Sequence, residues 1–93
     1  MHFALIYELV DDYLERRGAL REEHLALAKA ASERGELLLG GAFAEPADRA
    51  LLVWAADDVA VVRRFVDTDP YVANGLVRSW DIRPWTVVVG AAS

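Results

Sequence analysis

Residues 49–66, RALLVWAADDVAVVRRFV, decide the fold because they place a strand directly before a helix. The seven residues 49–55 form an almost unbroken apolar run of the length that is typical of a strand. Asp57 or Asp58 can then cap a helix, since a carboxylate accepts hydrogen bonds from free backbone N–H groups. The helical spacing of apolar residues predicts a buried side formed by Val59, Val62, Phe65 and Val66.

Outward from this unit, the sequence predicts three more strands and one more helix. Apolar runs predict strands over 2–9, 37–43 and 77–89, the last of them interrupted or bent near Pro84. The other segments are predicted to be a helix over 19–34, a loop over 11–18 and a turn over 69–75. The order β-α-β-β-α-β is the ferredoxin-like α+β arrangement, in which two helices cover one face of a four-stranded antiparallel sheet. We expect a single domain over residues 1–93.

Composition limits the kinds of partner and chemistry. The chain has 93 residues, no cysteine, two histidines and a net charge of -5. Disulfides and thiolate chemistry are therefore excluded, a metal site has little support, and an acidic domain repels nucleic acid backbones. The sequence contains no apolar run of about 18 residues and no leader-like segment at its start. We expect a cytoplasmic protein that binds neither nucleic acid nor membrane.

The strands are apolar on both faces, which predicts a homodimer. In the strand over 49–55, Leu51 and Val53 share one face, whereas Leu52 and Trp54 share the other. An antiparallel sheet with one face in water should alternate apolar and polar residues. Because two helices cover only one face, we expect the second face to meet the sheet of another copy across a two-fold axis.

His24 is the most informative polar residue because it lies at the centre of an apolar helix face. At about 100° per residue, its neighbours on that face are Leu20, Leu27, Ala28 and Ala31, and the residues roughly opposite are Glu22, Lys29 and Glu33. An imidazole that points inward needs a hydrogen-bond partner. Two interpretations stand: a core histidine bonded to a backbone carbonyl, or a site residue that acts as a general acid or base.

Four other residues are candidates for the same site. Asp69 is either a turn or cap carboxylate or the group that orients His24. Arg21, one turn before His24, is either a solvated side chain or an anion clamp, and Arg17 would join it if the helix began earlier. Gly41, within a glycine pair in a strand, marks either a bulge or the close approach of a ligand.

Four segments together resemble a known family. They are residues 21–25 (REEHL), 35–38 (GELL), 69–76 (DPYVANGL) and 82–85 (IRPW). In this order they resemble the YciI-like family over essentially the whole chain, with the Asp-Pro-Tyr segment as the most specific part. The resemblance implies a ferredoxin-like homodimer of the dimeric α/β barrel kind with a catalytic pair at His24 and Asp69. It leaves Arg21, Tyr71 and Gly41 as candidate substrate-binding residues.

The resemblance also implies a class of reaction. Some relatives eliminate chloride from chlorinated hydroxylated aromatics, and the related muconolactone isomerases shift protons on lactones. We therefore expect a small-molecule ligand, no cofactor and no metal, and acid–base chemistry on a small oxygenated cyclic or enolisable compound. A non-catalytic binding or sensing dimer is the alternative, and the sequence supports both. An interaction subunit with a vestigial pocket fits less well with an intact His24–Asp69 pair.

Overall fold

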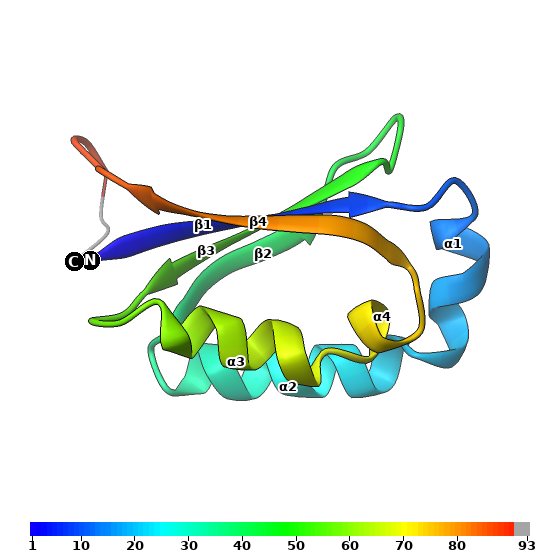
Figure 1. The fold of residues 1–93 in the computed structure, drawn as a ribbon, viewed down its shortest axis with the longest axis horizontal. Helices are drawn as coiled ribbons and strands as arrows, with labels where there is room; N and C mark the ends of the chain where they lie inside the picture. The colour runs from blue at the N-terminus through cyan, green and yellow to red at the C-terminus, as the bar shows by residue number, and fades with distance from the viewer. Residues whose placement is uncertain (91–93) are drawn as a thin grey trace.

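A four-stranded antiparallel sheet with helices on one face is the framework of the computed structural model, which describes residues 1–90 (Figure 1). The strands lie in the order β2-β3-β1-β4. Their bounds are His2–Leu9 for β1, Leu37–Ala42 for β2, Arg49–Ala55 for β3 and Val77–Trp85 for β4. The predicted ferredoxin-like α+β fold is therefore confirmed.

The helices form one layer beside the sheet. Their bounds are Tyr13–Arg16 for α1, Arg17–Ala19 for the 3-10 helix η1, Arg21–Glu33 for α2, Ala60–Thr68 for α3 and Pro70–Ala73 for α4. Figure 1 shows the two long helices, α2 and α3, on the same side of the sheet, with α1 and α4 near one end of it. No helix among the described residues is long and apolar enough to cross a membrane.

Two segments that we predicted to be irregular are helical instead. Residues 11–18 contain α1 and the start of η1, and the predicted turn over 69–75 contains α4. The turn of α4 forms because Pro70 occupies its first position, where the missing N–H costs nothing, and because Asp69 caps it. Short helices of this kind carry too few residues for an apolar period to show in a sequence.

The remaining differences lie at the ends of elements. The helix predicted over 19–34 begins at Arg21, because the residues before it form η1. The strand predicted over 37–43 ends at Ala42, and the last strand ends at Trp85 rather than at residue 89. Pro84 lacks an N–H group for a ladder, and β4 is an edge strand, so an end near this residue is expected.

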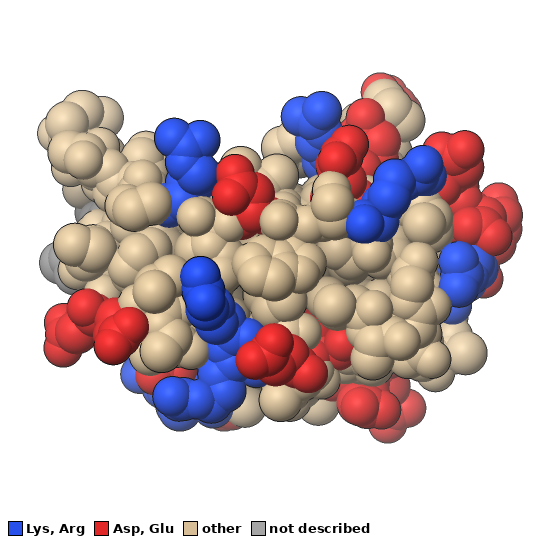
Figure 2. Space-filling model, viewed as in Figure 1, with Lys and Arg blue, Asp and Glu red and all other residues tan. Residues whose placement is uncertain are grey.

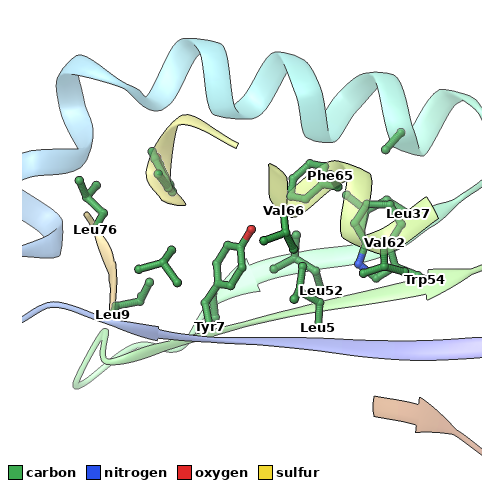
Figure 3. Packing of buried hydrophobic residues seen from close by; sticks show 14 of the residues in the cluster. Leu5, Tyr7, Leu9, Leu37, Leu52, Trp54, Val62, Phe65, Val66 and Leu76 are labelled. Atoms are coloured by element: carbon green, nitrogen blue, oxygen red, sulfur yellow. The ribbon is translucent and has the colours of Figure 1, made fainter. Parts of the chain in front are cut away.

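The core lies between the sheet and the long helices. Phe3 and Leu5 of β1 lie opposite Trp54 and Leu52 of β3, so all four side chains point to the helix side. The helix α3 contributes Val62, Phe65 and Val66, which are buried as the helical spacing predicted. Figure 3 shows Leu5, Leu52, Trp54 and the three α3 side chains between the two layers, with the hydroxyl of Tyr7 directed from β1 toward the helices.

The second face of the sheet carries no helix from residues 1–90 (Figure 1). The opposite parity of the central strands places Ala4 beside Val53 and Ile6 beside Leu51 on this face. Leu39 of the edge strand β2 pairs with Val53 on the same face and is 72% exposed. Figure 2 shows acidic and basic side chains interspersed over one side of the molecule, with uncharged surface between them.

Candidate active site

The site begins at the junction between α3 and α4. Asp69 ends α3 in an extended conformation, which is the conformation favoured before proline, and then caps α4. Its Oδ1 accepts a hydrogen bond from the Tyr71 backbone N–H at 3.0 Å. The side chain is completely buried. Local chain geometry therefore fixes a carboxylate beneath the helices, where it needs further donors.

Two side chains supply those donors. The Tyr7 hydroxyl donates to Asp69 Oδ2 at 2.8 Å, and His24 Nδ1 lies 2.8 Å from Asp69 Oδ1. With the Tyr71 N–H, three groups surround this carboxyl group, which in its ionised form can only accept hydrogen bonds. An ionised Asp69 requires Nδ1 of His24 to be the donor. In the neutral imidazole the free lone pair then lies on Nε2.

Aromatic contacts hold the imidazole ring in place. The rings of His24 and Tyr71 are stacked, with centroids 3.9 Å apart and an angle of 6° between their planes. Phe65 meets the imidazole edge-on at 6.2 Å. The His24 side chain is nevertheless 15% exposed. It is therefore an oriented histidine with access to solvent, and its partner is a carboxylate rather than a backbone carbonyl.

The exposed part of His24 contributes to a cavity of about 470 Å³ between α2 and the strands β2 and β3. Its polar lining residues are Tyr7, Tyr13, Arg17, Arg21, His24, Lys29, Ser32 and Tyr71. Leucines, alanines and the glycines of β2 form the rest of the wall. This composition, mostly apolar with a few polar groups, is typical of sites for small organic molecules.

The structure brings most of the sequence-predicted site residues to this cavity. Arg21, Tyr71 and Gly41 line it together with His24, and Arg17 lines it from η1. Asp69 lies behind His24. None of the three tryptophans lines the cavity.

The glycine pair of β2 is not itself a bulge. The irregularity in the pairing of β2 with β3 lies one step earlier, between Leu37 and Leu39. A Cβ atom at Gly40 would contact Leu52 at 3.5 Å, whereas one at Gly41 would meet nothing within 4 Å. Gly40 pairs with Leu52, so its missing Cβ faces the helix side and the core, whereas Gly41 pairs with Leu51 and its missing Cβ faces the second side of the sheet. Gly41 therefore lines the cavity with its backbone.

Burial and neighbouring groups shift the pKa values of Tyr7 and Tyr71. Burial, and secondarily the neighbouring Asp69 carboxylate that its hydroxyl contacts, raises the pKa of Tyr7 far above its usual range. Burial also raises the pKa of Tyr71, with Tyr13 acting in the same direction and the guanidinium groups of Arg21 and Arg17 opposing it. Both tyrosines are therefore neutral hydroxyl donors at physiological pH.

Sequence reasoning missed Tyr7 and Tyr13 as site residues. Tyr7 lies at an inward position of β1, and a buried tyrosine hydroxyl usually has a partner. The inward position of Tyr7 in the alternating pattern of β1 is the signal in the sequence that could have identified this residue. Tyr13 lies on the short helix α1, which the sequence did not predict. Its ring packs edge-on against that of Tyr71, with the ring centroids 5.8 Å apart. Among residues 1–90, no group of three or more His, Asp or Glu side chains is placed to hold a metal ion.

Comparisons with known proteins agree with this architecture. A 5-chloro-2-hydroxyhydroquinone dehydrochlorinase from Burkholderia phenoliruptrix, solved with 2,5-dihydroxybenzoquinone, matches with a TM-score of 0.78 and 20% identity over 92% of this chain and 94% of that one. A NIPSNAP family protein from Agrobacterium tumefaciens matches with a TM-score of 0.57 and 19% identity over 88% and 87% of the two chains. These likenesses show a shared fold. No curated protein matches the sequence.

The family is shown by a match over nearly the whole length. The family model described as the YCII-related domain covers residues 1–86 of the 93. That range contains every strand and helix and every residue that lines the cavity. The resemblance found in residues 21–25, 35–38, 69–76 and 82–85 is confirmed, and the chain belongs to the YCII-related domain family.

Proposed function

We propose that this protein is a cofactor-independent enzyme that moves a proton on a small oxygenated cyclic or enolisable compound. The observation that carries the proposal is the 2.8 Å contact between His24 Nδ1 and Asp69 Oδ1 beside the cavity. His24 is the proton-transfer group, and Asp69 is the residue that positions it. A histidine is suited to this work because its pKa usually lies near about 6.5.

The tautomer of His24 determines which ring nitrogen accepts the proton. With Nδ1–H donated to Asp69, the Nε2 lone pair of His24 takes a proton from a hydroxyl group, or from a carbon next to a carbonyl group. In an elimination, the electron pair left behind forms a double bond and a halide leaves with its own bonding pair. In an isomerisation, the imidazolium returns the proton to another atom of the same molecule. Both reactions are complete with the substrate and His24 alone.

The solved relative supports this class of substrate. That protein is a dehydrochlorinase of 5-chloro-2-hydroxyhydroquinone, and its bound ligand is 2,5-dihydroxybenzoquinone. A ring of this size fits a cavity of about 470 Å³. In this chain, the stacked rings of His24 and Tyr71 form a rigid part of the wall, and the backbone of Gly41 lines the cavity on β2. We assign substrate contact to Tyr71, Arg21 and Gly41 on this ground.

Matched histidine variants test the proposal. His24→Gln removes the base, whereas His2→Gln changes the other histidine, which lies on β1 and does not line the cavity. With chlorinated hydroxyhydroquinones and muconolactone-type lactones as substrates, we expect His24→Gln to lower turnover by about 10²–10⁴-fold. Asp69→Asn should lower it as well, and His2→Gln should leave it near the wild-type rate. Full turnover in folded His24→Gln would remove the proton-transfer role.

The same compounds separate an enzyme from a binding protein. If none of them is converted but one binds with an affinity that falls in His24→Gln, the domain is a small-molecule binding or sensing module. Calorimetry with 2,5-dihydroxybenzoquinone gives that affinity directly, because it does not require turnover. The result decides between the two functions that the sequence supports.

We also propose that the functional unit is a homodimer formed through the second face of the sheet. This face presents Ala4, Ile6, Leu51 and Val53 from the two central strands, and the helices of residues 1–90 lie on the other side. Arg83 and Asp81 of the edge strand β4 lie beside Ala4 and Ile6 on the same face. An apolar patch with polar residues at its edge usually meets a partner. A second copy suits it because the four patch residues of the central strands carry no charge and a two-fold axis pairs the patch with itself.

A further inference from the structure

The cavity wall has an uneven distribution of charge. The chain as a whole is acidic, with 15 Asp and Glu residues against 10 Lys and Arg. The charged residues that line the cavity are nevertheless all cations: Arg17, Arg21 and Lys29. No Asp or Glu residue among the described residues lines it. A cavity with cationic walls in an acidic protein raises the local concentration of anions.

These cations have no ionic partner in the part of the chain that the structure describes. The ion pairs formed by arginines join Arg16 to Asp12, Arg34 to Glu36 and Arg78 to Asp11. Arg17 lies instead over the ring of Tyr13, with its guanidinium carbon 5.4 Å from the ring centroid. Arg21 begins α2, where the positive end of the helix dipole disfavours a cation. Helix stability therefore does not account for the position of Arg21.

A buried hydroxyl group lies at the same place without a partner. Tyr71 is 2% exposed, and its Oη is buried with no hydrogen-bond partner at bonding distance among residues 1–90, although the Tyr13 side chain packs beside it and helps to raise its pKa. Such an orphaned group costs free energy unless a ligand or water satisfies it. The guanidinium groups of Arg21 and Arg17 are close enough to this hydroxyl to act on its pKa. One donor and two cations thus converge beside the His24 ring, which is stacked on Tyr71.

We infer that Arg17, Arg21 and the Tyr71 hydroxyl form a subsite for an anionic oxygen group of the substrate, either a carboxylate or an ionised enol. The inference rests on the proposed function, because it names the substrate class of the His24 site. Tyr71 donates a hydrogen bond and the guanidinium groups supply charge-assisted hydrogen bonds. Binding the anion here places the ring of the ligand against His24 and gives the Tyr71 hydroxyl an acceptor.

Three ligands that differ in charge test the subsite by calorimetry. They are 2,5-dihydroxybenzoate, which carries a carboxylate; 2,5-dihydroxybenzoquinone, which supplies an ionised enol; and 2,5-dihydroxybenzyl alcohol, which is neutral. We expect at least one anion to bind about 10-fold or more tighter than the alcohol, as hydrogen bonds to charged groups are worth about 1.5–3 kcal/mol. The advantage of the anion should shrink as salt is added. Equal affinities for all three ligands would overturn the inference.

Variants assign the effect to the named residues. Arg17→Gln and Arg21→Gln should each reduce the preference for the anion, and Tyr71→Phe should reduce it while the ring still stacks on His24. Arg63→Gln is the matched control, because Arg63 is exposed on α3 and does not line the cavity. An unchanged preference in both Arg17→Gln and Arg21→Gln would overturn the assignment.

The failure of this subsite is distinguishable from the failure of the proposed function. His24→Gln should lower turnover by about 10²–10⁴-fold and leave the preference for an anion in place, since it removes neither arginine nor the Tyr71 hydroxyl. A preference for the anion without any turnover would support the subsite and contradict the enzyme. Turnover that depends on His24 but is equal for anionic and neutral substrates would support the enzyme and contradict the subsite.

Discussion

Asp69 is the residue on which the geometry of the site depends. It is fully buried, and its two oxygens collect donors from Tyr7, His24 and the Tyr71 backbone, which belong to three separate segments of the chain. A buried carboxylate is stable only while such donors are present. The residue therefore joins β1, α2 and α4 at one point, and each partner can be tested by removing one group.

Tyr7→Phe removes one donor without changing the ring. We expect a loss of about 1–3 kcal/mol in the free energy of unfolding, because Asp69 Oδ2 then stays buried without a partner. Urea denaturation of Tyr7→Phe, Asp69→Asn and the double variant measures it. If Tyr7 acts through Asp69, the two losses should not add in the double variant. Additive losses would show that Tyr7 contributes only through packing.

The raised pKa of Tyr7 predicts a dependence of stability on alkaline pH. The unfolded chain loses the Tyr7 proton near the ordinary tyrosine pKa of 10.0, whereas the folded protein keeps it. The folded state then binds more protons, so the free energy of unfolding falls as pH rises above about 10. In Tyr7→Phe the free energy of unfolding should fall less steeply as pH rises above about 10. Thermal unfolding at a series of alkaline pH values measures this slope. Identical slopes in both proteins would contradict the prediction.

At the scale of elements, the sequence predicted the strands and long helices well because their apolar periods are long. The strands over 2–9 and 49–55 have the predicted bounds. The short helices α1 and α4 were missed, because four residues hold about one turn and leave no periodic pattern. Helical geometry also predicted that His24 faces the sheet, but it placed Lys29 on the opposite side. Lys29 lines the cavity because the cavity lies beside β2 rather than directly beneath α2.

The sequence alone predicted only part of the candidate site. The motif in residues 69–76 and the wheel of the first helix indicated Asp69 and His24, with Asp69 as the group that orients His24, and the structure places the two side chains in direct contact. Tyr7 and Tyr13 depend on the register of β1 and on the presence of α1, which are tertiary facts. Of the cationic wall, the sequence indicated Arg21 and Arg17 as candidates for an anion clamp, but Arg17 reaches the cavity from η1 rather than from an earlier start of the helix, and Lys29 was not indicated.

The end of α4 gives a prediction at the scale of elements. Gly75 follows α4 with a φ of +78°, a conformation that an L-residue adopts at a cost of about 1–2 kcal/mol. Gly75→Ala should therefore lower stability by about that amount and shift α4, which carries Tyr71. Gly35 also has a φ of +78°, so Gly35→Ala should lower stability by a similar amount. Gly35 follows the end of α2 and is remote from Tyr71 along the chain. Only Gly75→Ala should weaken binding of 2,5-dihydroxybenzoquinone.

Gly18→Ala is the control for these two variants. Gly18 has no positive φ, and a Cβ atom there would meet nothing within 4 Å, so its substitution should change stability little. Thermal unfolding and calorimetry on the three variants separate backbone strain from an effect on the site. Equal losses of affinity in Gly35→Ala and Gly75→Ala would show that the site responds to global stability alone.

At the scale of the whole molecule, a short chain has limited means to bury apolar surface. A protein of 93 residues buries roughly 60–65% of the surface that its unfolded chain exposes. Its helices cover one face of the sheet, and the core there is complete, with Leu5, Trp54 and Val62 fully buried. The second face is apolar along β1 and β3, carries Asp81 and Arg83 on β4, and has no covering layer among residues 1–90. Association of two such faces would bury it without any additional element.

Charge placed on that face tests the homodimer. Light scattering after gel filtration should give wild-type protein a mass of about twice the 10.3 kDa chain. Leu51→Glu puts a carboxylate at the centre of the proposed interface, where burial against its own copy across the two-fold axis is costly. We expect this variant to be monomeric and still folded by circular dichroism, because Leu51 points away from the helices. Leu14→Glu, an exposed leucine on α1, is the matched control and should remain dimeric. A wild-type monomer at micromolar concentration, or a dimer that persists in Leu51→Glu, would show that the second face does not form the interface.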